Sequence, residues 1–523
     1  MAGFQHGLPG PFAGQDLPWL LAARARLRPD HPFLVWAPFA GPAETWTYAR
    51  FHDDVGRLAA GLRRRGIGAG DPVLVHLENT PELLLATFAL AELGAIAVLT
   101  NTRAAGDEVA YFAAHSRSVA AVTQPGLAEL VHRAAPRLRW IAVTAHDAGI
   151  PAAAPRGDAF AALFAETAAD RPQRAPDPAL PVLVLYTSGT TSRPKGVVWT
   201  HANALWAARV NAAHEDLRPT DVHQIYLPLF HANALGYSLL ATLWAGGTAV
   251  LQPKWSTSRF WQVAGQHGTT WVSFIWFSLR AVLEGEIPAG HGLRMIGFAT
   301  SDPPAAQRLG VPCIGWWGMT ETISHGIVGT PHVPNTPGAI GRPAPEYDIQ
   351  IRREDGAPVV PGETGALFCR GVRGVSMFLE YLHDPAATAS AFDAEGWFAT
   401  GDLVTLLPDG AILFADRAKD MLKVGAENVA ASEIERVVMT VPGVREAAVV
   451  GQPHPMLDEV PVAFVTLDGG VDAAPLPEAV IAACRAALAD FKVPRAVHVI
   501  EDMPRATLEK IAKAELRRRL RGA

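Results

Sequence analysis

Apolar and polar positions follow one another along the first four hundred residues in blocks that predict strands and helices in turn. Continuous apolar runs predict buried strands, at residues 72–77, 95–100, 120–124 and 181–188. An apolar segment over 81–94 has the length and composition of a buried helix. Because strands that alternate with helices form parallel sheets covered by those helices, we expect an α/β fold. The stretch 150–181, rich in Ala, Pro, Arg and Asp, is expected to be a surface connection.

The pattern changes after residue 345. Short strands separated by the turns EDG, PGETG, DAEG and LPDG predict an antiparallel, barrel-like region over 345–416. A further set of elements then follows in its own order: helix 431–440, strands 445–451 and 460–467, helix 477–490, strand 496–500 and a basic terminal helix. We therefore expect a small α+β domain over 421–523, joined to the domain of residues 1–416 at 417–420.

Composition and charge narrow the class of protein. The 523 residues are 49% hydrophobic and 18% charged, with a net charge of −6, which is typical of a soluble globular protein and gives no general attraction to nucleic acid. The three cysteines lie far apart without a CxxC pair, and the N-terminus lacks a signal-peptide pattern, so we expect a cytoplasmic protein. Glu92 and Gly94 interrupt the most apolar stretch, 83–100, so we expect no membrane span.

The sequence YTSGTTSRPKG at 186–196 is the first stretch that predicts chemistry. It follows the apolar run PVLVL, and a Gly/Ser/Thr loop after a buried strand brings backbone N–H groups and hydroxyls together around an anion. Lys195 adds a point charge that suits phosphate. The spacing GxxxxGK[ST] of the P-loop fails here, since Ser192, Arg193 and Pro194 stand between the glycine and the lysine. The stretch therefore predicts a phosphate-binding loop of another kind.

This loop resembles the signature loop of the adenylate-forming, or AMP-binding, superfamily of acyl-CoA synthetases, luciferases and adenylation domains. Further motifs follow in the family's order between about residues 45 and 515. Within the family, the sequence most resembles carnitine, medium-chain or aryl acyl-CoA ligases. The resemblance implies a large N-terminal domain of two stacked αβ-sheet subdomains plus a β-barrel-like region, and a small mobile α+β C-terminal domain. It also implies a ligase that uses ATP to convert a carboxylic acid to an acyl-adenylate and passes the acyl group to coenzyme A.

The resemblance also implies an ATP site. In GWWGMTET at 315–322, Trp317 corresponds to the aromatic residue that stacks on adenine, Thr320 contacts phosphate and Glu321 holds Mg²⁺. Asp402 and Arg417 correspond to ribose-binding residues, with an interdomain salt bridge as the alternative. The full expected set of ATP-binding residues is Thr187, Ser188, Gly189, Thr190, Thr191, Lys195, Trp317, Gly318, Met319, Thr320, Asp402 and Arg417.

The implied catalytic and acyl-binding residues come from two further motifs. YLPLFHANALGY at 226–237 resembles the segment that carries the family's active-site histidine, here His231, and MPRATLEKIAKAEL at 503–516 carries Lys510, which stabilises charge on the α-phosphate. The expected catalytic residues are Lys510, His231, Thr187 and Lys195. The expected acyl pocket is lined by His231, Asn233, Tyr237, Trp316 and Gly318.

The bulk of Trp316, where many members have glycine, favours a compact or medium-sized acid over a long-chain fatty acid. Asp302 is expected either to meet a cationic substrate, as in ligases that act on carnitine-like acids, or to cap a helix.

The second half-reaction has its own expected residues. Lys419 falls at the hinge position, and Lys423, Gly425 and Ala426 are expected along the channel for coenzyme A or another acceptor. Ala426 replaces the second glycine of a pair, which narrows this channel and keeps open an amine acceptor, as in an amide synthetase. With the departures at Ser192 and Glu509, it also leaves open a non-catalytic adenylate-binding protein.

The partners expected on this interpretation are a small-molecule carboxylic acid, ATP with Mg²⁺, and coenzyme A or an amine, with no nucleic acid. The chain is expected to be a monomer or a homodimer.

Overall fold

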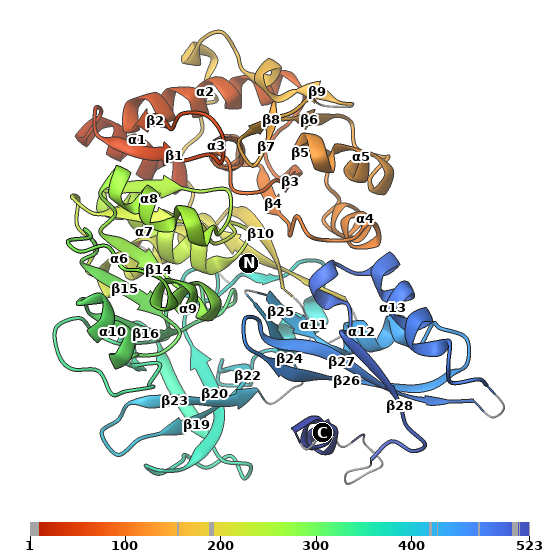
Figure 1. Cartoon of the computed structure of the whole chain (residues 1–523). Helices are drawn as coiled ribbons and strands as arrows, with labels where there is room; N and C mark the ends of the chain where they lie inside the picture. Colours follow the sequence, from red (N-terminus) through yellow and green to blue (C-terminus); the bar gives the residue numbers. More distant parts are fainter. Residues whose placement is uncertain are drawn as a thin grey trace.

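The computed structural model describes residues 10–153, 156–187, 193–417, 421–425, 427–468, 471–504, 511 and 513–521. Two large mixed sheets with their helices form the first two thirds of the chain, and a four-stranded sheet and a separate C-terminal sheet follow (Figure 1). The predicted α/β architecture with a small C-terminal α+β unit is confirmed.

The first large sheet has eight strands in the order β21-β11-β10-β4-β3-β5-β6-β9. Their bounds are β3 Pro72–His76, β4 Ile96–Leu99, β5 Ala120–Thr123, β6 Ile141–Val143, β9 Asp158–Ala159, β10 Pro181–Thr187, β11 Lys195–Thr200 and β21 Glu380–Tyr381. The strands from β10 to β6 pair in parallel, as the apolar runs predict. The expectation of parallel sheets fails at β11, which pairs antiparallel with β10, with Thr187 opposite Lys195.

Helices cover both faces of this sheet. Helices α4 (Gly106–His115) and α5 (Pro125–Ala134) pack against one face, through the core that holds Leu74, Val98 and Val184. Helices α1 (Leu17–Leu27), α2 (Tyr48–Arg64) and α3 (Pro81–Leu93) belong to the core on the other side. Because successive side chains of a strand point to opposite faces, continuous apolar runs are the pattern expected of strands buried on both sides.

The second large sheet has nine strands in the order β18-β17-β16-β15-β14-β12-β13-β1-β2. Their bounds are β1 Pro32–Trp36, β2 Glu44–Thr47, β12 Val222–Ile225, β13 Thr248–Leu251, β14 Trp271–Ser273, β15 Met295–Phe298, β16 Cys313–Trp317, β17 Ile327–Val328 and β18 Arg342–Pro343. The helices of this part are α6 His201–His214, the π-helix η3 Asn233–Leu240, α7 Ala241–Ala245, α8 Thr257–His267, α9 Trp276–Glu284 and α10 Pro303–Leu309.

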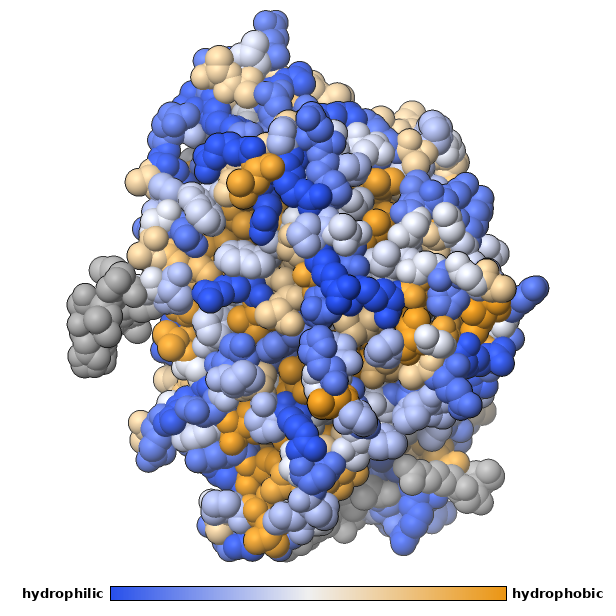
Figure 2. Space-filling model, turned by 90° about the vertical axis from the view of Figure 1, so that its left-hand side faces the viewer, coloured by the Kyte–Doolittle hydropathy of each residue, from blue (hydrophilic) through white to orange (hydrophobic). Residues whose placement is uncertain are grey.

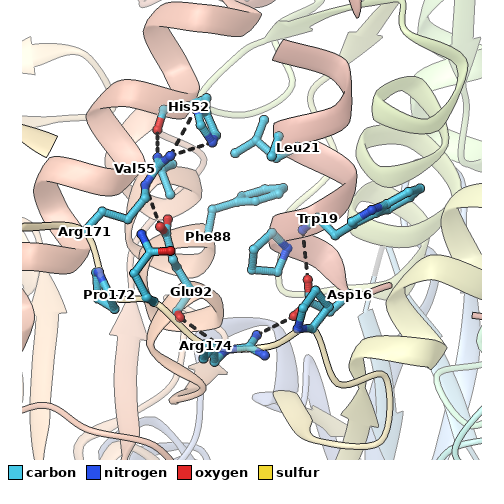
Figure 3. Close-up of a pocket in the computed structure, with 14 residues that line it drawn as sticks. Asp16, Trp19, Leu21, His52, Val55, Phe88, Glu92, Arg171, Pro172 and Arg174 are labelled. Carbon is cyan, nitrogen blue, oxygen red and sulfur yellow. Dashed lines mark hydrogen bonds and ion pairs between the residues drawn. The ribbon is translucent and has the colours of Figure 1, made fainter. Parts of the chain in front are cut away.

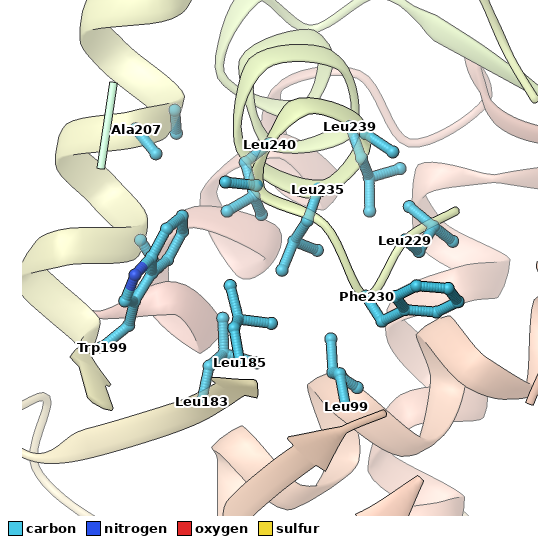
Figure 4. Packing of buried hydrophobic residues seen from close by; sticks show 14 of the residues in the cluster. Leu99, Leu183, Leu185, Trp199, Ala207, Leu229, Phe230, Leu235, Leu239 and Leu240 are labelled. Atoms are coloured by element: carbon cyan, nitrogen blue, oxygen red, sulfur yellow. The ribbon is translucent and has the colours of Figure 1, made fainter. Parts of the chain in front are cut away.

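The two large sheets share one core. Figure 4 shows Leu99, Leu183 and Leu185 of the first sheet facing leucines of η3 and the segment before it. Trp199 packs beside α6 at the edge of this layer, and its indole Nε1 donates a hydrogen bond to the carbonyl oxygen of Thr320. The core therefore connects the strand after the phosphate loop directly to the GWWGMTET segment.

The connection 150–181 crosses the surface with little regular structure, as predicted. It contains β8 (Ile150–Pro151, paired with β7 His146–Asp147), β9 and the short helices η1 (Phe160–Leu163) and η2 (Ala168–Asp170). Arg171 pairs with Glu92 at 2.6 Å and Arg174 pairs with Asp16 at 2.8 Å in a cavity of about 230 Å³ (Figure 3). These pairs attach the connection to helices α1 and α3.

The antiparallel region and the C-terminal sheet follow the predicted order. The four-stranded sheet is β19 (Asp348–Arg352), β20 (Thr364–Arg370), β22 (Phe398–Leu406) and β23 (Ile412–Arg417), with α11 (Pro385–Ser390) before β22. The C-terminal elements are β24 Met421–Val424, β25 Glu427–Ala430, α12 Ala431–Val438, β26 Val444–His454, β27 Asp458–Leu467, α13 Leu476–Ala487, η4 Asp490–Lys492, β28 Ala496–Val499 and α14 Lys513–Arg521. Their apolar side chains form cores of their own.

Ion pairs and hydrogen bonds join the C-terminal unit to the rest of the chain, and α13 lies beside α4 (Figure 1). The buried ammonium of Lys492 contacts carboxylates from both sides, Glu108 of α4 and Glu433 of α12. Arg103 pairs with Asp490 at 2.8 Å on the surface.

The outer surface mixes polar and apolar side chains. On the face in Figure 2, apolar groups are interspersed with strongly hydrophilic ones. Within the described ranges, no helix is both long enough and apolar enough to cross a membrane.

Candidate active site

Two of the predicted phosphate-binding residues lie on the paired strands β10 and β11. Thr187 and Lys195 are register partners on these two strands, and the Lys195 ammonium lies 4.4 Å from the centre of the Tyr381 ring. The Tyr381 hydroxyl donates a hydrogen bond of 3.0 Å to Oε1 of Glu321. Burial, followed by the Glu321 charge, raises the pKa of Tyr381, so its hydroxyl remains a donor. The structure thus brings together three of the predicted residues, Thr187, Lys195 and Glu321.

The loop between these strands, with the predicted residues Ser188, Gly189, Thr190 and Thr191, lies outside the described residues.

The predicted adenine- and ribose-binding residues lie where β16 meets the four-stranded sheet. The indole Nε1 of Trp317 donates a hydrogen bond of 2.9 Å to Oδ2 of Asp402, and both side chains are buried. Asp402 of β22 is the register partner of Arg417 of β23, so the two predicted ribose-binding positions lie side by side on adjacent strands. Thr322 fixes the turn after Trp317, because its hydroxyl accepts a hydrogen bond from the backbone N–H of Met319.

Two of the predicted acyl-pocket residues, Tyr237 and Trp316, lie close to Gly318. A methyl group at Gly318 would meet the Tyr237 hydroxyl and lie 2.7 Å from the carbonyl oxygen of Ser324, so only glycine fits there. Trp316 points to the other face of β16 from Trp317, and its ring lies 6.2 Å from that of Tyr237. Asn233, the first residue of the π-helix η3, accepts a hydrogen bond from the Ser273 hydroxyl. Such π-helical segments are rare and occur frequently at functional sites.

His231 lies at the junction with the C-terminal unit. Its Nε2 contacts Oε2 of Glu427 at 3.1 Å, although 196 residues separate the two in sequence. Burial by itself would raise the pKa of Glu427, but the charge and hydrogen bond of His231 outweigh it and lower this pKa. The His231 side chain is 33% exposed while that of Glu427 is buried, so the histidine is the partner that solutes reach.

The predicted acceptor-channel residues precede Glu427. The Lys423 ammonium lies 5.4 Å from the centre of the Phe414 ring, and Gly425 has a left-handed backbone with φ of 63°. Ala426, the hinge residue Lys419 and the catalytic candidate Lys510 lie outside the described residues.

Asp302 caps helix α10. Its carboxylate accepts a hydrogen bond of 3.1 Å from the backbone N–H of Ala305. Of the two interpretations of this residue, the structure supports the helix cap.

Two residues that contact the predicted ones, Tyr381 and Glu427, were not predicted from the sequence. Glu427 follows the predicted channel residues Gly425 and Ala426 in the segment KVGAENV, where no local pattern marks it as a partner of His231. Tyr381 lies in the segment FLEYLHDP, where no motif marks it; only the pairing of β21 with β11 places it beside Lys195.

Two family models and curated proteins match this chain. Residues 21–382 match the family model described as AMP-binding enzyme, and residues 433–510 match the AMP-binding enzyme C-terminal domain. A crotonobetaine/carnitine–CoA ligase of Salmonella paratyphi A is 32% identical over 96% of this chain and 99% of its own length.

Solved structures match over nearly the whole chain. A double mutant of the o-succinylbenzoate CoA synthetase of Bacillus subtilis, bound to its product analogue OSB-NCoA, has a TM-score of 0.81 at 27% identity, over 97% of this chain and 99% of that one. The same enzyme in complex with AMP gives 0.68, also at 27% identity, over 96% and 98%. An amide bond synthetase from Marinactinospora thermotolerans gives 0.80 at 26% identity, over 95% and 99%.

The chain therefore belongs to the AMP-binding enzyme family. Within it, the protein is an AMP-forming acyl-CoA synthetase, which activates a carboxylic acid with ATP and Mg²⁺ and transfers the acyl group to coenzyme A. The predicted enzyme class and cosubstrates are confirmed.

Proposed function

We propose that this ligase acts on a compact or medium-sized acid and that the residues described above divide its two half-reactions between them. Trp316 and Gly318 lie beside Tyr237, whereas the side chain of Trp317 points to the opposite face of strand β16. This arrangement is the observation that carries the proposal. One strand, β16, thereby separates an acyl side from a nucleotide side.

In the first half-reaction, a carboxylate oxygen attacks the α-phosphorus of ATP and pyrophosphate leaves, forming the acyl-adenylate. Lys195 and the loop 188–192 hold the leaving phosphates, Trp317 and Asp402 hold the adenosine, and Lys510 neutralises charge on the α-phosphate. The buried carboxylate of Glu321 offers the hard oxygen ligand that Mg²⁺ prefers. When bound, Mg²⁺ would neutralise phosphate charge.

In the second half-reaction, the thiolate of coenzyme A attacks the acyl carbonyl carbon and AMP leaves. In this proposal His231 faces the incoming acceptor, and the contact of 3.1 Å with Glu427 orients its ring. We propose that residues 417–420 are the hinge between domains 1–416 and 421–523, with Lys419 at its centre. The higher TM-score to the complex with a coenzyme A product analogue than to the AMP complex supports assigning this domain orientation to acyl transfer.

The size of the acid follows from the packing of Trp316. Its ring is stacked between Trp271, at 6.0 Å and 6°, and His325, at 4.6 Å and 12°. A side chain held on both faces cannot swing aside without disturbing the core, so it limits the depth of the pocket. The relatives named for crotonobetaine and carnitine, both compact acids, are consistent with this limit.

An amine acceptor is the second candidate, because the amide bond synthetase matches almost as well as the coenzyme A complex. Pyrophosphate release from ATP should be measured with a panel of acids of graded length, first alone and then with coenzyme A or simple amines. We expect release with compact acids and thioester formation with coenzyme A. Faster turnover with an amine would favour the amide synthetase, and release with long-chain acids only would refute the proposed pocket.

A further inference from the structure

Tyr381 contacts both of the charged residues proposed for the phosphate side of the site. The ammonium of Lys195 lies over the face of its ring, 4.4 Å from the ring centre, and its hydroxyl donates a hydrogen bond of 3.0 Å to Oε1 of Glu321. Lys195 begins β11, whereas Glu321 follows β16. One aromatic side chain therefore connects a cation and an anion that belong to separate elements.

The backbone of Tyr381 is fixed to the strand that carries Lys195. Strand β21 pairs antiparallel with β11, and Tyr381 is the register partner of Val197. Because side chains of a strand alternate between its faces, Tyr381 lies on the same face as Val197 and as Lys195, two residues earlier. The backbone N–H of Tyr381 also donates a hydrogen bond of 2.9 Å to the hydroxyl of Thr388. The side chain is 6% exposed, so its ring has little room to move.

The segment that leads to Tyr381 is attached to Glu321 as well. The backbone N–H of Phe378 donates a hydrogen bond of 2.9 Å to the carbonyl oxygen of Glu321, and the Phe378 ring lies 4.7 Å from the Tyr381 ring. Both Tyr381 and Glu321 are buried, and a hydrogen bond to a charged group is stronger there than in water. The hydroxyl of Tyr381 therefore fixes the orientation of this carboxylate.

The two contacts hold the charges in place without cancelling them. An aromatic face attracts the Lys195 ammonium electrostatically but carries no net charge, so the positive charge and the N–H donors remain available to phosphate oxygens. A neutral phenol that donates to Glu321 likewise leaves the negative charge of the carboxylate available to a divalent cation. A direct ion pair between Lys195 and Glu321 would instead consume both charges.

We propose that Tyr381 is a positioning residue for adenylate formation: its ring directs Lys195 to the leaving phosphates of ATP, and its hydroxyl orients Glu321 for Mg²⁺. The ring and the hydroxyl thus have separate tasks. The inference rests on the proposed function, because it concerns the phosphate side of the same ATP site. It gives Tyr381 no part in acyl transfer to coenzyme A, since pyrophosphate has left before that step.

The test separates the hydroxyl from the ring. Tyr381→Phe removes the hydroxyl and retains the ring, whereas Tyr381→Leu removes both. ATP binding to the full-length enzyme is measured by titration calorimetry over a range of Mg²⁺ concentrations. In Tyr381→Phe, we expect the half-saturating Mg²⁺ concentration to rise about tenfold, the order expected of one hydrogen bond to a charged group. The Kd for ATP at saturating Mg²⁺ should change by less than about twofold, because the ring still holds Lys195.

Tyr381→Leu tests the ring. We expect this variant to show the same Mg²⁺ effect and, in addition, a Kd for ATP at saturating Mg²⁺ that is raised about tenfold, since the Lys195 ammonium loses its aromatic contact. If Tyr381→Leu folds poorly, Tyr381→Met provides a second variant of similar bulk without a ring, and it should show the same two effects.

The control variant is Tyr347→Phe. Tyr347 is as buried as Tyr381, at 6% exposed, but its hydroxyl donates to backbone carbonyl oxygens, those of Thr322 and of Ser376 at 3.1 Å. Loss of this hydroxyl should lower the free energy of unfolding, as in Tyr381→Phe, and leave the Mg²⁺ dependence of ATP binding unchanged.

A second measurement distinguishes positioning from a merely structural role. Pyrophosphate release is followed with the compact acid that the wild type activates fastest, and acyl transfer to coenzyme A is followed from the supplied acyl-adenylate of that acid. In Tyr381→Phe, we expect release at limiting Mg²⁺ to fall about tenfold and acyl transfer to stay within about twofold of the wild type.

Two results would overturn the inference: a wild-type Mg²⁺ dependence of ATP binding in Tyr381→Phe, or an equal loss of both half-reactions in that variant. An unchanged Kd for ATP in both Tyr381→Leu and Tyr381→Met would overturn the task of the ring. Absence of pyrophosphate release by the wild type with every acid would instead refute the proposed function, and it is distinguishable because ATP binding is measured without any acid.

Discussion

The buried ammonium of Lys492 predicts that Glu108 controls the balance between the two half-reactions. Lys492 lies between Glu108 on the N-terminal side and Glu433 on its own side, at 2.8 Å from the latter. Burial by itself would lower the pKa of Lys492, but attraction to Glu433 and Glu108 outweighs it and raises this pKa. The lysine is therefore charged in this domain orientation. Glu108→Gln removes the interdomain charge pair and retains the shape of the side chain.

The free energy lost in Glu108→Gln depends on the interactions that Lys492 retains in the variant. Removing one partner of a buried ion pair costs about 3–5 kcal/mol when the other charge is left alone. Here Lys492 retains Glu433, and the glutamine retains an oxygen that accepts a hydrogen bond, so we expect about 2 kcal/mol. That free energy corresponds to about a thirtyfold shift of the equilibrium away from the present domain orientation.

The assay separates the half-reactions. Acyl transfer from a supplied acyl-adenylate to coenzyme A should fall by up to about thirtyfold in Glu108→Gln, whereas pyrophosphate release should be unchanged or faster. The control is Asp490→Asn, because Asp490 also joins the two sides but its side chain is 81% exposed. Exposed ion pairs contribute little, so this variant should change acyl transfer by less than about fivefold. Equal loss of both half-reactions, or no change in either, would refute the reasoning.

Three further predictions concern the nucleotide, acyl and mobile parts of the site. Asp402→Ala removes the acceptor of the Trp317 indole, so the KM for ATP should rise about tenfold or more in steady-state kinetics; an unchanged KM would place ATP elsewhere. Gly318→Ala should lower the free energy of unfolding in urea by about 1–3 kcal/mol, since its methyl group would meet Tyr237; unaltered stability would contradict this packing. Lys510→Ala should block pyrophosphate release but spare acyl transfer from supplied acyl-adenylate, and equal loss of both would count against domain rotation.

The strands and helices were largely predictable because their signals are local. The apolar runs at 72–77 and 120–124 became β3 and β5, since a strand buried on both faces needs apolar side chains at every position. The predicted helix over 81–94 runs from Pro81 to Leu93, between a capping Thr80 and a left-handed Gly94. The reversal of β11 was missed, because pairing direction depends on the partner strand.

The candidate site was predictable only in part. The residue types of the phosphate loop and of GWWGMTET indicated their chemistry, because hydroxyls, a lysine and a carboxylate in fixed order suit phosphate and Mg²⁺. Glu427 carried no such signal of its own. It reaches His231 only through the docking of one domain on another, which no local pattern encodes.

The sequence by itself therefore determined the elements, their order and the class of reaction, since these depend on periodicity and on motifs within short windows. The tertiary structure alone decided which distant residues meet: Tyr381 with Lys195 through the pairing of β21 and β11, and Glu108 with Lys492 across the domains. It also decided that Glu215, an ordinary charged residue in sequence, is buried beside aromatic rings. Burial and long-range pairing arise from how whole sheets and domains pack, and only the folded chain specifies that packing.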